Sequence, residues 1–410
     1  MDQKTITTRC CIVGGGPAGI MTGFLLARSG ISVTVLEQWP DFFRDFRGDT
    51  IHPSTLELLH ELNILEAFLR LPINKTYQLG GEIGGKSLIL ADFSSLKTRC
   101  PYIAFIPQWD FLNFMVEQAK QYPTFNLLMQ TEAIDILEEN NRCVGVVAKC
   151  ADKEFQIRAD LVIGADGRHS MVREKSHLPV QVLGAPMDVL WFRLSRKTSD
   201  ETFSLGKINF GKILIMINRE SYWQCGFLIR KGTFETIQKN GLDAFRESLL
   251  AVSPNLNDRV SELTSWDQIK LLTVTVDRLT KWYKSGLLCI GDAAHAMSPI
   301  GGVGINLAIQ DAVAAANRLV PAFQTNTLTE DTLCAIQKRR LFPTRCIQRI
   351  QVFLQDRIIN RVLGKVNHPE IPFVFKLFNR VPFLRRIPAY IIGIGFRPER
   401  IEVTPETNSR

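Results

Sequence analysis

Three glycines near the amino terminus have the spacing of a phosphate-binding turn. Gly14 allows a strand to turn sharply, Gly16 has no Cβ and lets backbone approach a pyrophosphate, and Gly19 lets a helix pack closely on the strand. The free N–H groups at the start of that helix would point at the phosphates. The predicted phosphate contacts are Gly14, Gly16, Pro17, Ala18 and Gly19.

An acidic residue follows this turn at the distance expected for a ribose ligand. Glu37 ends an apolar run that begins at Ile31, and it lies 18 residues after Gly19. A carboxylate at this strand end can accept both hydroxyls of an adenosine ribose, and an acid favours a free 2′-hydroxyl. The glycine turn alone is weak evidence, but strand, helix, strand and terminal acid together predict binding of FAD or NAD rather than NADP.

A second glycine-rich stretch lies between residues 286 and 311. A buried strand is predicted to end in Gly291-Asp292, and a loop with three glycines leads into a helix that begins near Gly304. The Asp292 carboxylate can accept ligand hydroxyls, and the open helix N-terminus suits an electron-rich ring edge or a carbonyl. His295 follows the same strand, and we expect a packed, hydrogen-bonded histidine rather than a base.

The segment after the first β-α-β unit carries polar residues toward the same ligand. The next helix is expected to begin with Ser54 as N-cap, and Glu57 would complete a capping box. Arg47 then lies at the rim, where it can bind a pyrophosphate or cover a cofactor ring; the alternative is an ion pair with a neighbouring aspartate. His52 either faces the same cleft or is an ordinary buried histidine.

The elements that position these residues predict an α/β fold. Apolar runs around the first turn indicate buried parallel strands with a crossover helix, a Rossmann-like three-layer sandwich. Residues 125–165 are predicted as a β meander, and alternating segments between 187 and 230 as a half-buried, mostly antiparallel sheet. This sheet would form an inserted substrate domain, followed by C-terminal helices. The predicted boundaries are 1–75, 98–180 and 270–330 for the dinucleotide-binding domain, 76–97 and 181–269 for the substrate domain, and 331–410 for the C-terminal helical segment.

Bulk properties indicate a globular enzyme. The chain has 410 residues with 45% hydrophobic and 22% charged residues, which is enough for two ordinary domains. The net charge of +8 is dispersed, which argues against nucleic-acid binding. The nine cysteines include no C-x-x-C pair, so we predict neither a metal site nor structural disulfides. The first residues lack a signal-peptide pattern, and a cytoplasmic location is expected.

The C-terminal part leaves two interpretations open. Residues 363–400 alternate apolar stretches with basic residues. These segments either pack as helices on the dinucleotide-binding domain or form a basic amphipathic surface that contacts a membrane peripherally and admits a lipophilic substrate.

Three separated motifs resemble those of single-component FAD-dependent monooxygenases, the aromatic hydroxylases similar to para-hydroxybenzoate hydroxylase and the ubiquinone-pathway hydroxylases. They are the stretch from Gly14 to Glu37, the turn Ala165-Asp166-Gly167 with Ser170 and Arg173, and Gly291-Asp292 with Pro299 to Asn306. The chain differs from flavin halogenases because it lacks their Trp-x-Trp-x-Ile-Pro motif, and a thioredoxin-like extra domain is not expected.

This resemblance implies roles for individual residues. Glu37 would hold the FAD ribose, Asp292 would bind the ribityl chain, and Asp166 would contribute to both FAD and nicotinamide cofactor binding. The other implied FAD contacts are Arg47, Gln108, Pro299, Gly301, Gly302, Gly304, Ile305 and Asn306.

The same resemblance implies an activity. NADH or NADPH would reduce FAD transiently across the cleft, and O2 would then give a flavin hydroperoxide that hydroxylates an aromatic or similarly electron-rich small molecule. Two alternatives stay open, a flavin-dependent reductase of an isoprenoid double bond and a non-catalytic flavin-binding protein. The inserted sheet should form an apolar roof over the flavin with few polar groups. No catalytic acid or base is identified; the substrate candidates are His52, Arg193, Tyr222, Trp223 and Gln224.

Overall fold

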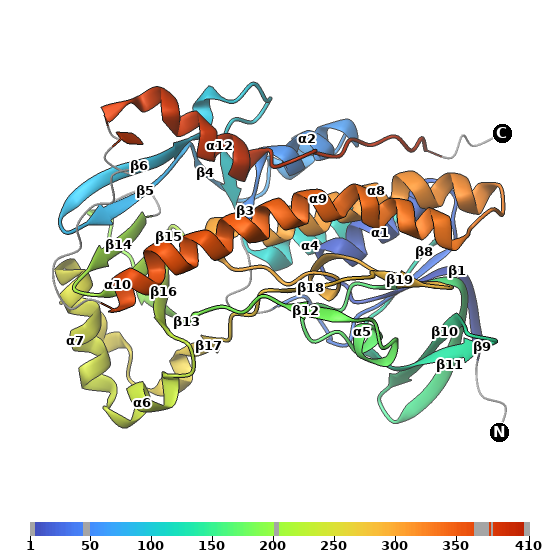
Figure 1. Ribbon diagram of the computed structural model, residues 1–410, viewed down its shortest axis with the longest axis horizontal. Helices are drawn as coiled ribbons and strands as arrows, with labels where there is room; N and C mark the ends of the chain where they lie inside the picture. Colours follow the sequence, from blue (N-terminus) through green and yellow to red (C-terminus); the bar gives the residue numbers. More distant parts are fainter. Residues whose placement is uncertain (1–4, 44–49, 201–204, 365–376, 379, 406–410) are drawn as a thin grey trace.

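A computed structural model describes residues 5–43, 50–200, 205–364, 377–378 and 380–405. Figure 1 shows a sheet centred on parallel strands toward one end of the molecule and a mostly antiparallel sheet toward the other, with long helices crossing between them. This architecture confirms the predicted fold class, a Rossmann-like α/β unit with an added antiparallel sheet and C-terminal helices.

The eight-stranded sheet contains five adjacent parallel strands. Four of them have buried stretches, and these are almost continuously apolar: residues 10–13, 33–36, 161–164 and 287–289. One prediction for this sheet was wrong, because β8 lies parallel to β2 and does not belong to a meander with β9 and β10. The strands, in order, are β19 (Tyr283–Lys284), β20 (Leu287–Cys289), β11 (Lys153–Gly164), β1 (Thr5–Val13), β2 (Val33–Leu36) and β8 (Phe125–Leu128), with β10 (Arg142–Cys150) beside β11 and β9 (Thr131–Glu139) beside β10.

The helices of this half pack around one hydrophobic core. Helix α1 (Pro17–Arg28) packs on α8 (Gly304–Gln324), and α8 packs on α9 (Glu330–Leu354), as Figure 1 shows. As predicted, α1 stops just before Gly30, whose φ of 77° is left-handed. The remaining helices near this core are α2 (Pro53–Glu61), α3 (Leu65–Phe68), α4 (Gln108–Ala119) and α5 (Met171–Lys175).

The second large sheet is covered differently on its two faces. Helix α7 (Leu242–Val252), which follows α6 (Phe234–Lys239), packs on one face. The opposite face packs against Ile300 and α10 (Asn360–Gly364). Its strands, in order, are β17 (Lys270–Leu272), β13 (Met187–Ser195), β16 (Tyr222–Arg230), β15 (Lys212–Asn218), β14 (Leu205–Asn209), β5 (Gln78–Ile83) and β6 (Lys86–Asp92).

Two small sheets complete the fold. Strand β12 (Val180–Val182) pairs with β18 (Asp277–Leu279), and β7 (Ile103–Phe105) lies between β3 (Thr50–Ile51) and β4 (Asn74–Thr76).

The start of α2 differs from the prediction. Its N-cap is His52 and its first residue is Pro53, because proline lacks the N–H that would otherwise be unsatisfied there. Glu57 forms no capping box; its carboxylate instead accepts the backbone N–H of Arg99 at 2.7 Å.

The C-terminal segment returns to the rest of the fold. Helix α12 (Arg386–Gly393) packs on β6 and on the turn Phe93–Ser95, and it buries Ala389 and Gly393. Its other face exposes Ile387 and Tyr390. Within the described ranges, no helix combines the length and hydropathy needed to cross a bilayer.

Candidate functional site

Strand register brings the predicted motifs to one edge of the eight-stranded sheet. Val13 lies opposite both Leu36 and Gly164, and Gly164 lies opposite Cys289. These strands are parallel, so the residues that follow them meet at the carboxyl edge, where α/β sheets of this type bind ligands. The residues gathered there are Gly14, Glu37, Asp166 and Asp292.

The first glycine turn is held by close backbone contacts. Gly14 has a φ of 106°, and a Cβ on it would overlap the carbonyl group of Ala165. A Cβ on Gly19 would overlap the carbonyl oxygen of Gly14, so helix and strand touch as predicted. Gly16 is different, since the nearest atom to a Cβ there is the Ala165 carbonyl oxygen at 3.9 Å. The backbone at Gly16 is therefore open to a ligand.

Glu37 is oriented at the end of β2 by the turn itself. Its carboxylate accepts the backbone N–H of Gly15 at 3.2 Å and that of Trp39 at 3.1 Å. The side chain is largely buried. A carboxylate fixed beside the phosphate turn in this way suits the hydroxyls of a ribose.

The second glycine loop is held by side chains from elsewhere in the chain. Gly301 and Gly302 have φ values of 81° and 62°. The Thr50 hydroxyl donates to the Gly302 carbonyl at 2.9 Å, and a Cβ on Gly302 would come within 2.5 Å of that hydroxyl oxygen. Gly304 begins α8 and has no atom within 4 Å of its Cβ position, so the N-terminus of this long helix is uncovered there.

Both polar atoms of the Asn306 side chain form hydrogen bonds that connect this loop with β3 and the start of α2. Its carbonyl oxygen accepts the His52 N–H at 2.9 Å and the Thr55 hydroxyl at 2.7 Å. Its amide nitrogen donates to the carbonyls of Thr50 at 3.0 Å and Gly302 at 3.5 Å. Any contact of Asn306 with a ring is therefore made by its backbone, and Ile305 beside it is buried.

His52 is completely buried beside the second loop. Its Nδ1 lies 2.7 Å from the carbonyl oxygen of Ile392, so Nδ1 carries the proton and donates. Burial lowers the pKa of His52 to about 4, although the hydrogen bond to Ile392 opposes this shift. Nε2 is a bare acceptor with no partner among the described residues. The structure thus keeps His52 neutral and leaves one acceptor for a small ligand or water.

Asp292 is accompanied by a cation that the sequence interpretation missed. The Arg168 guanidinium lies 3.7 Å from the Asp292 carboxylate, and both side chains are partly exposed. Arg168 directly follows Asp166-Gly167, and β11 and β20 are neighbours, so the pairing of these strands was the signal that could have revealed it.

Asp166 supports the turn after β11. One carboxylate oxygen accepts the N–H of Val172 in α5 at 3.1 Å, while Ser170 caps the same helix by accepting the Arg173 N–H at 2.9 Å. Burial raises the pKa of Asp166. Its Oδ1 is buried without a hydrogen-bond partner among the described residues, and its Cα lies against Gly14.

Of the two remaining predicted FAD contacts, the structure describes one and not the other. Gln108 is the first residue of α4, which follows β7, and β7 pairs with β3 beside the second loop. Arg47 lies outside the described residues, so its predicted role stays a prediction.

His295 is a packed histidine, as expected. It is buried, its Nε2 lies 2.5 Å from the Asp311 carboxylate, and its ring lies 5.0 Å from the ring of Trp282. Asp311 also accepts the N–H of Gly291 at 3.1 Å and that of the Arg340 guanidinium at 2.8 Å. Burial would raise the pKa of Asp311, but His295 and Arg340 together lower it below the usual value.

The candidates on the seven-stranded sheet fall on opposite faces. Arg193 pairs with Gln224 across β13 and β16, and its guanidinium lies 5.0 Å from the centre of the Tyr222 ring. These three share the face that packs against Ile300 of the second loop. Trp223 points the other way, into the core under α7, where its indole N–H donates to Asp200 at 2.9 Å. This placement gives no support to Trp223 as a substrate contact.

The open backbone positions fit an extended dinucleotide. Gly16, Gly167 and Gly304 lack close neighbours at their Cβ positions, and they follow β1, β11 and the second loop respectively. Helices α1 and α8, whose N-termini present N–H groups, pack side by side. No group of three or more potential metal ligands occurs in the described part of the chain. The site is thus built for a phosphate-containing organic cofactor.

Comparison of the sequence with known proteins identifies the family to which the chain belongs. The family model described as "FAD binding domain" matches residues 7–349. The chain is 32% identical over 382 residues to 6-methylpretetramide 4-monooxygenase of Streptomyces rimosus, covering 93% of this chain and 91% of that protein. It is 23% identical to para-nitrophenol 4-monooxygenase of Pseudomonas sp. (strain WBC-3), covering 81% and 82% of the two chains.

Solved structures show the same fold. The structure of pqsL, a probable FAD-dependent monooxygenase from Pseudomonas aeruginosa, superposes with a TM-score of 0.74 at 20% identity, covering 87% of this chain and 98% of that one. The chain therefore belongs to the family of single-component FAD-dependent monooxygenases of the aromatic-hydroxylase type.

Proposed function

We propose that this monooxygenase uses NADH or NADPH and O2 to hydroxylate an aromatic or similarly electron-rich small molecule. The observation that carries the proposal is the register of the parallel strands, which gathers the glycine turn, the ribose acid and Asp292 at one sheet edge. Family membership supports monooxygenation. The two co-substrates are proposed on the family's general chemistry.

The residues at this edge would hold FAD along its length. The N-terminus of α1 and the open backbone at Gly16 suit the pyrophosphate, and Glu37 suits the adenosine ribose. Asp292 suits the ribityl hydroxyls, and the uncovered N-terminus of α8 suits the polar edge of the ring. Bound FAD would supply the redox chemistry, accepting hydride and activating O2.

The chain's own task is then to position the substrate and exclude water. Beside the second loop, Ile300 packs with the inner face of the seven-stranded sheet, which carries Trp191 and Ile217. Ile217 also joins Phe105 and Ile392 in a second apolar cluster, with residues of β6 and α12. Apolar walls of this kind keep water from the reacting centre. His52 Nε2 is the buried acceptor next to them and is proposed to orient a substrate hydroxyl.

The substrate class is proposed from the most extensive match described above. That relative is named for 6-methylpretetramide, and it aligns over nearly the whole length of both chains. We propose a substrate chemically related to 6-methylpretetramide, rather than one related to para-nitrophenol, whose namesake enzyme is less similar. Peripheral membrane contact by the C-terminal segment stays a prediction.

The experiment is direct. The purified protein should be yellow or take up FAD, and 6-methylpretetramide should stimulate its oxidation of NADH or NADPH more than para-nitrophenol does. Under ¹⁸O2 the product should gain one labelled oxygen. A protein that binds no FAD contradicts the cofactor assignment, and a product that forms equally well without O2 contradicts monooxygenation in favour of a reductase.

A further inference from the structure

The C-terminal segment makes a buried ionic contact with the cofactor half of the molecule. Glu399 accepts a hydrogen bond from the Arg340 guanidinium at 3.1 Å, and Arg340 also donates to Asp311 at 2.8 Å. All three side chains are buried. A buried charge without its partner is costly, so these residues hold one another in place.

This ionic contact ends at the loop that follows β20. Asp311 is the acceptor for the N–H of Gly291, the residue directly before Asp292, and for the ring of His295. Glu399 is therefore connected through Arg340 and Asp311 to the amino-terminal end of the loop 291–306, which carries the predicted ribityl and ring contacts.

Helix α12 reaches the other end of the same loop. The Ile392 carbonyl accepts the His52 Nδ1–H at 2.7 Å, and the His52 backbone N–H donates to Asn306. The Ile392 side chain also lies 3.9 Å from the Cβ position of Gly301. The C-terminal segment thus contacts the loop directly near Gly301 and is linked to its other end at Gly291 through Arg340 and Asp311.

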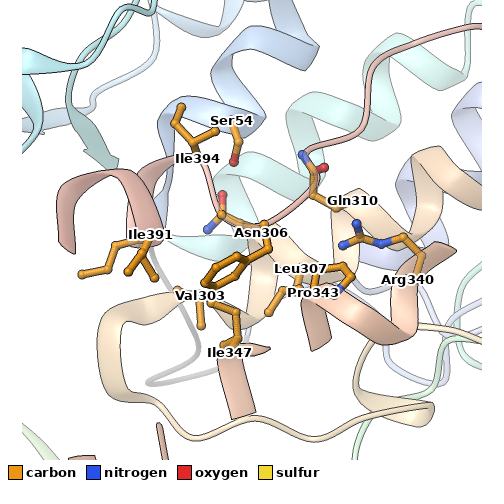
Figure 2. Close-up of a pocket in the computed structure, with 13 residues that line it drawn as sticks. Ser54, Val303, Asn306, Leu307, Gln310, Arg340, Pro343, Ile347, Ile391 and Ile394 are labelled. Carbon is orange, nitrogen blue, oxygen red and sulfur yellow. The ribbon is translucent and has the colours of Figure 1, made fainter. Parts of the chain in front are cut away.

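The space between these two contacts is almost filled. A pocket of about 30 Å³ is lined by Asn306, Gln310 and Arg340 together with Ile391 and Ile394 of the C-terminal segment. Figure 2 shows these side chains around it. Gln310 accepts the Glu399 N–H at 2.5 Å, and its amide nitrogen has no partner among the described residues. The rest of the pocket lining is mostly apolar, including Val303, Leu307 and Ile347, so the C-terminal segment is packed against the start of α8 with little space between them.

The chain after α12 is also anchored away from the loop. The Asn317 amide donates to the Arg400 carbonyl at 2.8 Å and accepts the Glu402 N–H at 3.0 Å. The Ser29 hydroxyl donates to the Thr404 carbonyl at 3.2 Å. These contacts involve α1 and α8 but no residue of the loop 291–306, so they offer a matched comparison.

We infer that residues 386–399, which lie beyond the stretch 7–349 matched by the family model, are a positioning element of the cofactor site. They hold the loop 291–306 at both ends, and Glu399 is the positioning residue that acts on Gly291 through Arg340 and Asp311. The inference rests on the proposed function only in that this loop contacts FAD.

The experiment compares Glu399→Gln with Asn317→Ala in the full chain. Both changes weaken the attachment of the C-terminal segment, but only the first removes the charge that faces Arg340. We expect Glu399→Gln to raise the FAD dissociation constant at least tenfold and to alter the visible circular dichroism of bound flavin. Asn317→Ala should leave the dissociation constant within about twofold of the parent.

Two further variants keep the test decisive. Arg339→Gln removes a second, partly exposed partner of Glu399, at 2.8 Å, and should behave like Asn317→Ala. Glu399→Asp keeps the charge and should restore part of the FAD affinity, also if Glu399→Gln does not fold. Equal FAD affinity and spectra in all variants would overturn the inference. Absence of FAD binding by the parent chain would instead overturn the proposed function.

Discussion

The two glycine loops of this protein are held in place by different means. The first, residues 14–19, is fixed by its own backbone and by the neighbouring Ala165, with Gly14 and Gly19 in direct contact. The second, residues 299–304, is held by Thr50 and Ile392 from distant segments and by the side chain of Asn306, which follows it directly in α8. The nucleotide end of the site is therefore set by backbone contacts between neighbouring parallel strands, whereas the ring end also depends on side chains from other parts of the fold.

The two loops are therefore expected to differ in role: the first binds the phosphates, and the second sets the position of the reacting ring. A turn that binds phosphates through its backbone can be reused without change, because its geometry is set by its glycines and the adjoining parallel strands. A ring position set by β3, α2 and α12 can shift when any of these segments changes. We expect variation in reaction and substrate to arise from the second loop and its supports.

The largest effect is expected where the local loop is tightest. In Gly19→Ala the new methyl group would overlap the carbonyl oxygen of Gly14, and the backbone must move. We expect a loss of about 3 kcal/mol in unfolding free energy, measured with urea, together with loss of FAD binding. Gly304→Ala is the control in the second loop, because nothing lies within 4 Å of its Cβ position. A Gly19→Ala protein as stable as the parent would contradict the close contact.

The next effect concerns the main support of the second loop. Asn306→Ala leaves the His52 N–H, the Thr55 hydroxyl and the Thr50 carbonyl without their partner. We expect unfolding free energy to fall by about 2–3 kcal/mol, since buried groups lose their hydrogen bonds. Asn126→Ala, at an exposed position on β8, should change it by less than about 0.5 kcal/mol. Similar values for both variants would show that Asn306 does not hold the loop.

A smaller, pH-dependent effect should come from His52. Its folded pKa of about 4 lies below the ordinary histidine value of 6.5, so the unfolded chain takes up the proton first as pH falls. The stability contributed by neutral His52 is complete above the unfolded pKa and is lost as pH falls toward the folded pKa. This one group should account for about 2 kcal/mol between roughly pH 7 and 5.

The measurement is urea unfolding at several pH values, with His52→Asn as the variant that removes the titrating ring. The pH dependence of the parent should exceed that of His52→Asn by the stated amount. Parallel curves for parent and His52→Asn would mean that the buried ring does not resist protonation.

The smallest effect on stability should appear at the open position of the first loop. A methyl group on Gly16 meets no atom closer than 3.9 Å, so Gly16→Ala should leave unfolding free energy within about 0.5 kcal/mol of the parent. The same methyl group occupies space that a pyrophosphate needs, and we expect FAD affinity to fall at least tenfold, equivalent to about 1.4 kcal/mol. Unchanged affinity, measured by flavin fluorescence, would place the phosphates elsewhere.

The sequence predicted those parts of the fold that depend on local pattern. The β-α-β unit and the acid at Glu37 were predictable because glycine spacing and apolar runs act over a few residues. Strand alternation predicted the antiparallel sheet, but not which face Trp223 would take beside its neighbour Gln224. The direction in which each β16 side chain points is decided by packing against α7 on one face and Ile300 on the other, and both lie outside β16 in the sequence.

The rest of the site depends on contacts that no short pattern contains. Glu57 has the spacing of a capping box, yet the Arg99 N–H takes its carboxylate and His52 caps α2. The pairing of Arg168 with Asp292 required the neighbouring positions of β11 and β20. The contact of Glu399 with Arg340 joins segments that have no shared motif.

The position of Glu399 near the C-terminal end of the sequence means that it is synthesised after the glycine loop that it helps to position. A ribosome synthesises both glycine loops and α9 well before it reaches Glu399 and the anchor at Thr404. We expect a nascent polypeptide arrested after α9 to bind the adenine nucleotide part of FAD before the site for the flavin ring has formed. The isoalloxazine ring would then bind late in synthesis, only after the segment through Thr404 has emerged from the ribosomal exit tunnel.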